Sequence, residues 1–268
     1  MNHRFLELDL LRSLAILLMV IYHLAYDLEF FYHQNLGIPD HPAWIVFERC
    51  TAGLFLLLVG CSFAISWNRH HGKHPDAPFR KRYRKYLKRS LGVIACGMLV
   101  SIATYIVDPE TYVRFGILHL IGVSILLLPF FANLREWNAV LGIVTIGLGN
   151  GLPFDTLRAF GGLGTVNTNL LLPFGWMPPD FFSVDYFPLI PWFGAVLIGY
   201  SIGYYFYVRG KLPIFSIFNF QFLAGHSSRK SDGWSILSWP GRNALLIYLL
   251  HQPILLGILG LVASLKIL

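Results

Sequence analysis

Long apolar runs separated by short polar stretches extend along the whole chain. A transmembrane helix needs roughly 20 mostly apolar residues to cross about 30 Å of hydrocarbon. Runs of about this length lie near residues 8–30, 44–67, 90–107, 114–133, 138–154, 186–208 and 241–265. The run at 138–154 is the weakest, because it is short and contains glycines and a proline, so seven spans could become six. The pattern predicts an all-α fold, a polytopic integral membrane bundle of about seven transmembrane helices in a single domain over residues 1–268.

The composition supports this prediction, and the distribution of charge predicts the orientation of the protein in the membrane. Of the 268 residues, 55% are hydrophobic and 13% are charged, and the net charge is +7. Nine of the 21 Lys and Arg residues fall in the segment 69–89, whereas the connections 31–43, 108–113 and 155–185 contain only Arg158. Because cytoplasmic loops carry the excess of Lys and Arg, we expect an N-in, C-out protein of the cell (inner or plasma) membrane. Lipids, and not nucleic acid, are then the expected partners.

Two connections are unusually long. The outer segment 155–185 contains the apolar stretch NLLLPFGWM, which could fold back against the bundle or belong to a disordered surface loop. The inner segment 209–240 ends in HSSRKSDGWS and is expected to be mobile. The first run is too long and too polar at its end for a cleaved signal peptide, so we expect it to be retained.

Four ionisable residues interrupt the first apolar run: Asp9, Arg12, His23 and Asp27. An ionisable residue at membrane depth costs a few kcal/mol, which makes it a candidate site residue. Arg12 and His23 are eleven residues apart, so they lie within roughly 20° of the same helix face, about 16 Å apart along the axis. Asp27 follows His23 by one turn and could fix its tautomer, leaving the other ring nitrogen free as a base. In the alternative, Asp9 and Arg12 form an interfacial pair and His23 is a structural residue.

Polar residues in other spans supply further candidates. Glu48 and Arg49 begin the second span from the outside, and Arg114 and His119 begin the fourth. Each of them could line a ligand cleft or could be an interfacial or satisfied buried residue. Three histidines in the sequence HHGKH could bind a metal, but Asp76 is the only carboxylate near them, so no metal is expected.

The last span also carries polar residues. Tyr248 and His251 are three residues apart and share a helix face. Pro253 frees a backbone carbonyl nearby, which favours a polar cavity over a lipid-facing surface. His251 is therefore a second candidate for a catalytic role, with a polar patch that holds helices together as the alternative.

The order of these residues resembles that of a known family. Arg12, ten intervening residues and His23 match the Arg-x10-His signature of the integral-membrane acyltransferases that O-acetylate bacterial surface glycans. Five segments, LDLLRSLAILLMVIYH, AGLFLLLVGCSFAIS, YVRFGILHLIGVS, DYFPLIPWFGAVLIG and GRNALLIYLLHQPIL, resemble more closely the bacterial branch of the heparan-alpha-glucosaminide N-acetyltransferase catalytic family. The resemblance covers nearly the whole chain.

The resemblance implies a membrane-embedded acyltransferase. It would move an acetyl (acyl) group from cytosolic acetyl-CoA to an amine or hydroxyl of a glycan or amino sugar on the extracytoplasmic side. With this function, the residues expected to be catalytic are His23, as general base or transient acyl carrier, with Asp27 and His251, which were singled out above by their positions. In the lysosomal branch the position of His23 is Asn and the catalytic His lies further along the chain, so His33 and His41 remain alternatives here.

Charge and position along the helices suggest which residues would bind the donor and the acceptor in such a reaction. The residues expected to bind the phosphates of acetyl-CoA are Arg12, Arg80, Arg82, Arg84 and Lys85, since basic clusters recognise phosphates. The basic segment could instead bind only anionic lipid. The residues expected at the acceptor are Glu48, Arg49, Arg114 and His119. A homodimer is left open, and the alternative functions are a proton-coupled membrane transporter and a non-enzymatic membrane protein.

Overall fold

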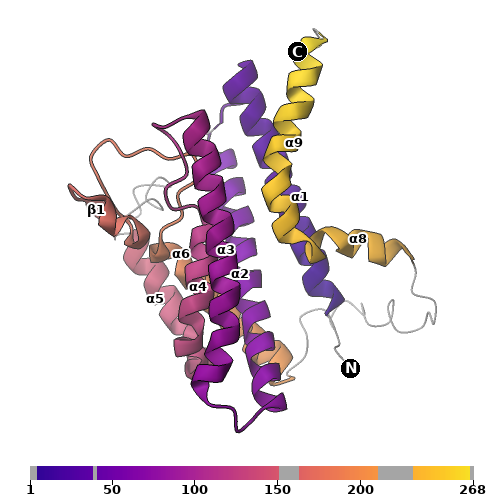
Figure 1. The fold of residues 1–268 in the computed structure, drawn as a ribbon, viewed down its shortest axis with the longest axis vertical. Helices are drawn as coiled ribbons and strands as arrows, with labels where there is room; N and C mark the ends of the chain where they lie inside the picture. The colour runs from indigo at the N-terminus through magenta and orange to yellow at the C-terminus, as the bar shows by residue number, and fades with distance from the viewer. Residues whose placement is uncertain (1–4, 39–40, 151–162, 211–231, 266–268) are drawn as a thin grey trace. The chain divides into compact units, whose positions relative to one another are not determined.

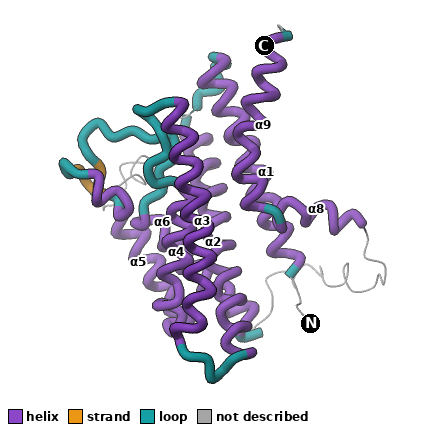
Figure 2. Tube along the Cα trace, viewed as in Figure 1, coloured by secondary structure: helices purple, strands orange, loops and turns teal. Residues whose placement is uncertain are grey.

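The computed structural model describes residues 5–38, 41–150, 163–210 and 232–265, and it is almost entirely helical over these ranges (Figures 1 and 2). Contacts divide the chain into two compact units. The first unit contains the described residues up to Phe55 and those after position 231, and the second unit contains the described residues from Leu56 to position 210. Each unit is described separately below.

Three helices and part of a fourth make up the first unit. They are α1 (Leu6–Tyr32), the first part of α2 (Pro42–Lys73), α8 (Asp232–Arg242) and α9 (Ala244–Ser264). α9 runs alongside α1 and contacts it, whereas α8 packs on α1 but crosses its direction (Figure 1). α1 ends at Tyr32, and the next residue, His33, has a left-handed backbone (φ 53°) that stops the helix.

The second unit is built from helix pairs. Its long elements are the rest of α2, α3 (Phe79–Val107), α4 (Ile117–Phe131), α5 (Asn138–Asn150) and α6 (Leu189–Gly203). Its short elements are η1 (Ala132–Trp137), β1 (Gly164–Thr165), η3 (Asn169–Phe174), β2 (Trp176–Met177) and the π-helical η4 (Tyr204–Val208). α3 packs mainly on α4, and α5 on α6, while β1 and β2 form a short parallel pair.

The chain reverses direction between α4 and α5. Arg135 in η1 leaves the helical region (φ 51°, ψ −118°), which breaks the helical stretch at this point. α5 then packs closely on α6, with Gly142 against Gly194 and Gly149 against Pro191. Residue numbers rise along α5 where they fall along α6, so the two helices are antiparallel.

Small residues allow α2 and α6 to approach each other closely. A Cβ atom added at Gly60 would lie 1.9 Å from the carbonyl oxygen of Val196, and one at Gly199 would lie 2.1 Å from that of Leu57. No larger residue fits at either position without a shift of the backbone. Helices in membranes commonly associate through such small-residue contacts, because lipid supplies no hydrophobic drive between them.

The prediction of an all-α, multi-pass membrane protein is confirmed. Among the described residues, six helical stretches are long and apolar enough to cross a membrane. One of the six, Ile117–Gly149, contains both α4 and α5 and is interrupted at Arg135. α5 has 13 residues, which corresponds to about 20 Å, and residues 151–154 of the seventh predicted span lie outside the described part. The N-in, C-out orientation stays a prediction.

Three sequence expectations are corrected or narrowed. Most of the basic segment 69–89 is helical, because α2 continues to Lys73 and α3 begins at Phe79; Lys and Arg are good helix formers. Residues 232–240, expected in a mobile connection, belong to α8. Part of the outer segment, residues 163–185, is ordered as β1, η3 and β2, with Leu172 buried. The remaining parts of these two connections, including Arg158, lie outside the described residues.

Candidate active site

Two histidines on different helices meet in the first unit. His23 lies on α1 and His251 on α9, and their ring centroids are 4.7 Å apart with the planes nearly perpendicular. His251 is buried and His23 is partly buried. The structure therefore brings together the two histidines that the sequence singled out from the first and last spans.

Backbone carbonyls determine the tautomer of both rings. Nδ1 of His23 lies 2.9 Å from the carbonyl oxygen of Met19, and Nδ1 of His251 lies 2.6 Å from that of Tyr248. A carbonyl oxygen can only accept a hydrogen bond, so each Nδ1 carries the proton. The Nε2 atom of each neutral ring is then an acceptor with a free lone pair, which is the form that a general base requires.

Asp27 lies one turn beyond His23 and has a different partner from the one expected. Its Oδ1 accepts a hydrogen bond of 2.7 Å from Nε2 of Gln252, the residue that follows His251 on α9. The carboxylate is fully buried. The orienting role expected of Asp27 is thus taken by the Met19 carbonyl, and Asp27 instead links α1 to α9.

Gln252 is a residue that the sequence interpretation missed. An uncharged amide next to a histidine in an apolar helix stands out less in the sequence than a charged residue does. The available signal was its position in the sequence HQP, next to a candidate His and just before the helix proline.

Aromatic residues of α2 pack beside this cluster. The ring of Tyr22 lies 5.9 Å from that of His23, 6.3 Å from that of Trp44 and 6.4 Å from that of Phe47. Glu48 follows Phe47 and is close enough to Tyr22 and Arg49 to interact electrostatically. Glu48 and Arg49, both partly buried, thus belong to the same unit as the histidine pair.

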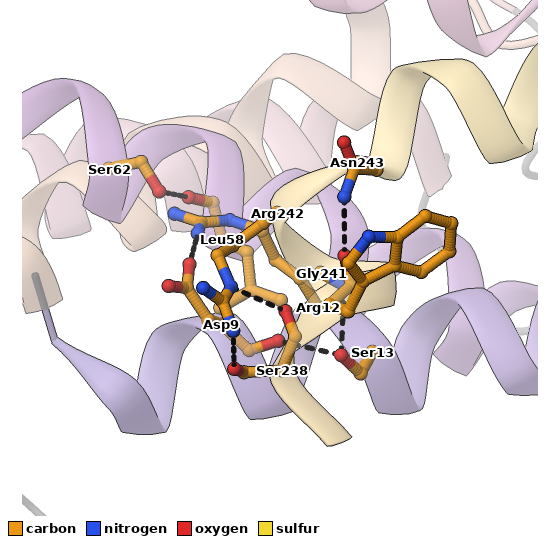
Figure 3. A network of polar contacts seen from close by, with 10 residues as sticks. Asp9, Arg12, Ser13, Leu58, Ser62, Ser238, Gly241, Arg242 and Asn243 are labelled. Carbon is orange, nitrogen blue, oxygen red and sulfur yellow. Dashed lines mark hydrogen bonds and ion pairs between the residues drawn. The ribbon is translucent and has the colours of Figure 1, made fainter. Parts of the chain in front are cut away.

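The opposite end of α1 carries a second polar cluster (Figure 3). Arg12 forms an ion pair with Asp9, as one of the two sequence interpretations expected. The hydroxyl of Ser13 accepts a hydrogen bond of 2.8 Å from the backbone N–H of Gly241 in α8. Arg242 bonds within α8, since its Nη2 lies 2.6 Å from Oγ of Ser238. This cluster holds α8 against α1.

Apart from Arg12, the basic residues expected to bind phosphate lie on the first turns of α3, and they have different surroundings. An open surface depression of about 430 Å³ is lined by Lys81, Arg84, Lys85 and Lys88, which repeat at helical spacing along one face. Two of the expected residues, Arg84 and Lys85, therefore belong to a concave basic surface. It also includes two lysines that were not singled out.

Arg82 is placed differently. Its Nη1 donates to Nδ1 of His71 over 2.7 Å, and its guanidinium carbon lies 5.3 Å from the ring centre of Trp67. These contacts join the start of α3 to the end of α2. Arg80 is exposed and does not line the depression.

In the second unit, His119 is buried near the start of α4. The backbone N–H of Gly116 donates to its Nδ1 over 3.3 Å, so the neutral ring carries its proton on Nε2. Asp185 lies at the same helix end, where its Oδ2 accepts from the N–H of Ile117 over 3.2 Å. Asp185 was not among the predicted site residues, although it opens one of the segments that resemble the family.

Arg114 lies between aromatic rings close to that helix end. Its guanidinium carbon is 5.2 Å from the ring centre of Tyr112 and 5.1 Å from that of Phe181, both within cation–π range. Tyr186 donates its hydroxyl hydrogen to the carbonyl of Leu172 over 2.7 Å, and burial raises the pKa of this phenol. The contacts of Arg114 thereby tie the connection that precedes α4 to the one that precedes α6.

The two alternative histidines lie apart from these contacts. His33 is the exposed cap of α1, and His41 is exposed with its Nδ1 accepting from the N–H of Ala43 over 3.2 Å. Within the described part of the chain, no group of three or more His, Cys, Asp and Glu side chains could hold a metal ion.

Comparison with protein families gives a match over nearly the whole chain. The family described as heparan-alpha-glucosaminide N-acetyltransferase, catalytic, matches residues 4–253. The chain belongs to this family. The resemblance drawn from the five segments is thus confirmed, and the family is one of multi-pass membrane N-acetyltransferases that use acetyl-CoA. No curated protein and no solved structure matches the chain.

The extent of the match bears on the site. Residues 4–253 include all of α1 and α9 as far as Pro253, so the matched region contains the histidine pair and Asp27 with Gln252. It also contains Arg114, His119 and the basic turns of α3. The match does not assign a role to any of them.

Proposed function

We propose that the chain transfers an acetyl group from cytosolic acetyl-CoA to an amine or hydroxyl of a glycan on the extracytoplasmic side, with His23 as the catalytic base. The observation that carries the proposal is the His23–His251 pair. Two imidazoles lie in ring contact, and a backbone carbonyl holds each in the Nδ1–H tautomer. Each therefore offers a basic Nε2 atom.

The chemistry needs one of these Nε2 atoms to take a proton from the acceptor. The acceptor oxygen or nitrogen then bonds to the acetyl carbon, the carbon–sulfur bond breaks, and the CoA sulfur leaves as thiolate and takes up a proton. In a two-step variant, Nε2 itself forms the bond to the acetyl carbon first and passes the group to the acceptor. Both variants require a neutral imidazole whose Nε2 atom is correctly oriented, and the carbonyls of Met19 and Tyr248 hold the two rings in a defined orientation.

Donor binding is proposed for the basic residues predicted from the sequence. Arg84 and Lys85 are supported by their place in the concave basic surface of α3, because clustered cations recognise phosphates. Arg82 forms a hydrogen bond with His71, and Arg12 forms an ion pair with Asp9. These contacts hold both side chains in place, so each would bind phosphate from a fixed position. Acetyl-CoA supplies the acyl group and the thiolate leaving group.

Acceptor binding is proposed for Glu48, Arg49, Arg114 and His119. Glu48 and Arg49 lie in the unit that contains the histidine pair. His119 presents a buried Nε2–H donor, and Arg114 is a cation held among aromatic rings. Donors and aromatic surfaces of this kind suit the hydroxyl groups and apolar faces of a sugar ring.

The test measures acetyl transfer and CoA binding on purified protein in lipid nanodiscs. The donor is acetyl-CoA with an isotopically labelled acetyl group, and the acceptor probe is methyl glucosaminide. His23→Ala should lower turnover by about 10²–10⁴-fold, the usual contribution of a general base, while CoA binding changes by no more than a few-fold. His251→Ala should also lower turnover.

The exposed residues give matched controls, because His33→Ala and His41→Ala should retain near-normal turnover. If one of these variants is inactive while His23→Ala is active, the base is assigned to the wrong histidine. If the wild-type protein neither binds CoA nor transfers the label, the acetyltransferase proposal fails. Proton-coupled uptake of a solute by such a protein would then favour the transporter alternative.

A further inference from the structure

Near Asp27, the buried polar side-chain atoms that lack a hydrogen-bond partner among the described residues are acceptors. Oδ1 of Asp27 already accepts from Gln252, while Oδ2 has no partner among the described residues. Oε1 of Gln252 and Nε2 of His251 are buried and without a partner in the same part of the chain. In the Nδ1–H tautomer, Nε2 of His251 can only accept.

These atoms are close together in the fold. Asp27 is one turn from His23 on α1, and Gln252 follows His251 on α9. One pair is joined by a hydrogen bond and the other by ring contact, so the two cross-helix contacts lie within about one helical turn of each other. Several buried acceptors thus gather where the two helices meet.

An acceptor cluster of this composition is complementary to a cation with several N–H donors. A buried acceptor that lacks a donor is costly, and a carboxylate without a counter-charge is more so. A protonated primary amine brings three N–H donors and one positive charge. A hydroxyl group brings one O–H donor and no charge, so it satisfies fewer of these atoms.

We infer that Asp27 and Gln252 determine the specificity of the site for an amine by binding the ammonium form of the acceptor beside the histidine pair. The inference rests on the proposed function and deepens it. Asp27 supplies the counter-charge through Oδ2, and Gln252 fixes that carboxylate with its N–H while its own carbonyl accepts a further N–H.

The proton balance agrees with the presence of two imidazoles. An ammonium group must lose one proton before its nitrogen can bond to the acetyl carbon, and it loses a second when the amide forms. The carbon–sulfur bond breaks, and the thiolate takes up one of the two protons while the other is released to water. His23 and His251 offer two Nε2 lone pairs for these transfers, whereas a hydroxyl acceptor loses only one proton.

The experiment compares two ligands that differ at one position. Methyl glucosaminide carries an amine where methyl glucoside carries a hydroxyl, and binding of each to the purified protein in nanodiscs is measured without acetyl-CoA near neutral pH. The wild type should prefer the glucosaminide by about tenfold or more, as expected for charge-assisted hydrogen bonds. Asp27→Asn keeps the shape of the side chain and should reduce this preference to about twofold or less.

Gln252→Leu and Ser13→Ala complete the set. Gln252→Leu removes the partner of Asp27 and should also reduce the preference for the amine. Ser13→Ala removes a different cross-helix hydrogen bond in the same unit, the one from Gly241. It should leave the preference unchanged, and thermal unfolding of all variants shows whether they remain folded.

Two binding results would overturn the inference, and a competition result would do so as well. One is equal binding of the two ligands by the wild type, and the other is an unchanged preference in a folded Asp27→Asn protein. Competition by KCl or NaCl as strong as that by the glucosaminide would reassign the cluster to an inorganic cation. This outcome can be told apart from that of the proposed function. If the preference for the amine does not depend on Asp27, the inference fails, but transfer activity that depends on His23 still supports the proposed function. If the transfer assay fails, a preference for the amine that depends on Asp27 still supports the inference.

Discussion

The rings of His23, His251 and His119 each form a hydrogen bond with a backbone group, and the kind of backbone group decides their chemistry. His23 and His251 each donate from Nδ1 to a carbonyl, so their Nε2 atoms are acceptors. His119 instead accepts at Nδ1 from the N–H of Gly116, so its Nε2 is a donor. The first two suit proton removal, whereas the third suits hydrogen bonding to a ligand oxygen.

These tautomers can be observed directly. In protein labelled with ¹⁵N in histidine, solid-state NMR should show a protonated Nδ1 and a non-protonated Nε2 for His23 and His251. His119 should show the reverse. Single His→Asn variants assign each signal, and the exposed His33 serves as a reference ring in water. A protonated Nε2 in neutral His23 would mean that the Met19 carbonyl does not orient the ring, which would remove its role as a base.

For single residues, the sequence predicts which side chains are reactive better than it predicts their hydrogen-bond partners. His23 and His251 could be found because an ionisable residue in an apolar run stands out. The bond from Gln252 to Asp27 joins residues 225 positions apart and depends on how α1 and α9 pack. No helical periodicity within one segment contains that information.

At the scale of the helices, one glycine, Gly241, allows α8 to approach the backbone of α1 closely. A Cβ atom at Gly241 would lie 1.9 Å from the carbonyl oxygen of Asp9 and 3.0 Å from Oγ of Ser13. The backbone N–H of Gly241 also donates to that serine (Figure 3). α8 therefore meets α1 through backbone contact, next to the ion pair of Asp9 with Arg12.

Gly241→Ala should destabilise the protein by about 1–3 kcal/mol, as overpacking at a close contact usually does. The measurement is thermal or denaturant unfolding of the purified protein in detergent. Gly233→Ala in the same helix is the matched control, because no atom lies within 4 Å of the Cβ position there. Replacement of this glycine should be neutral or stabilising by up to about 1 kcal/mol. Equal stability of the two variants would contradict the close contact between α8 and α1.

The helices that could be predicted from the sequence are those with a long apolar run, and shorter helices were harder to predict. The long runs that became α1, α2, α3 and α9 were each found, because hydrocarbon thickness imposes a minimum length. α8 was missed, since an 11-residue helix that contains serine, glycine and Pro240 has the composition of a loop. Its exposed Ile236, Leu237 and Trp239 form a turn-length apolar patch that a search for spans does not detect.

At the scale of the whole chain, the second unit gathers its basic connections at one end. Phe79 at the start of α3 lies 5.7 Å from Phe130 at the end of α4, measured between ring centroids. Arg209, just after η4, forms an ion pair with Glu136 of η1. The α2–α3 turn, η1 and η4 thus share one end of the unit. The connections 108–116 and 183–187 meet at the other, where Phe187 N–H donates to the Phe115 carbonyl over 2.9 Å.

This arrangement makes the number of crossings testable, because α5 returns antiparallel to α6 from the basic end. With Cys50, Cys61 and Cys96 replaced, single cysteines are introduced by His74→Cys in the α2–α3 turn, Asn167→Cys between α5 and α6, and Ser264→Cys at the end of α9. All three positions are exposed, and a membrane-impermeant maleimide is added to sealed right-side-out vesicles.

Seven crossings and the positive-inside rule predict that Asn167→Cys and Ser264→Cys react from outside, whereas His74→Cys reacts only after the vesicles are opened. If α5 does not cross, Asn167→Cys must lie on the same side as His74→Cys. The two crossings that follow, α6 and α9, then also reverse, so Ser264→Cys must change side as well. A six-span protein would therefore protect all three cysteines in sealed vesicles, and labelling of Asn167→Cys alone would contradict both arrangements.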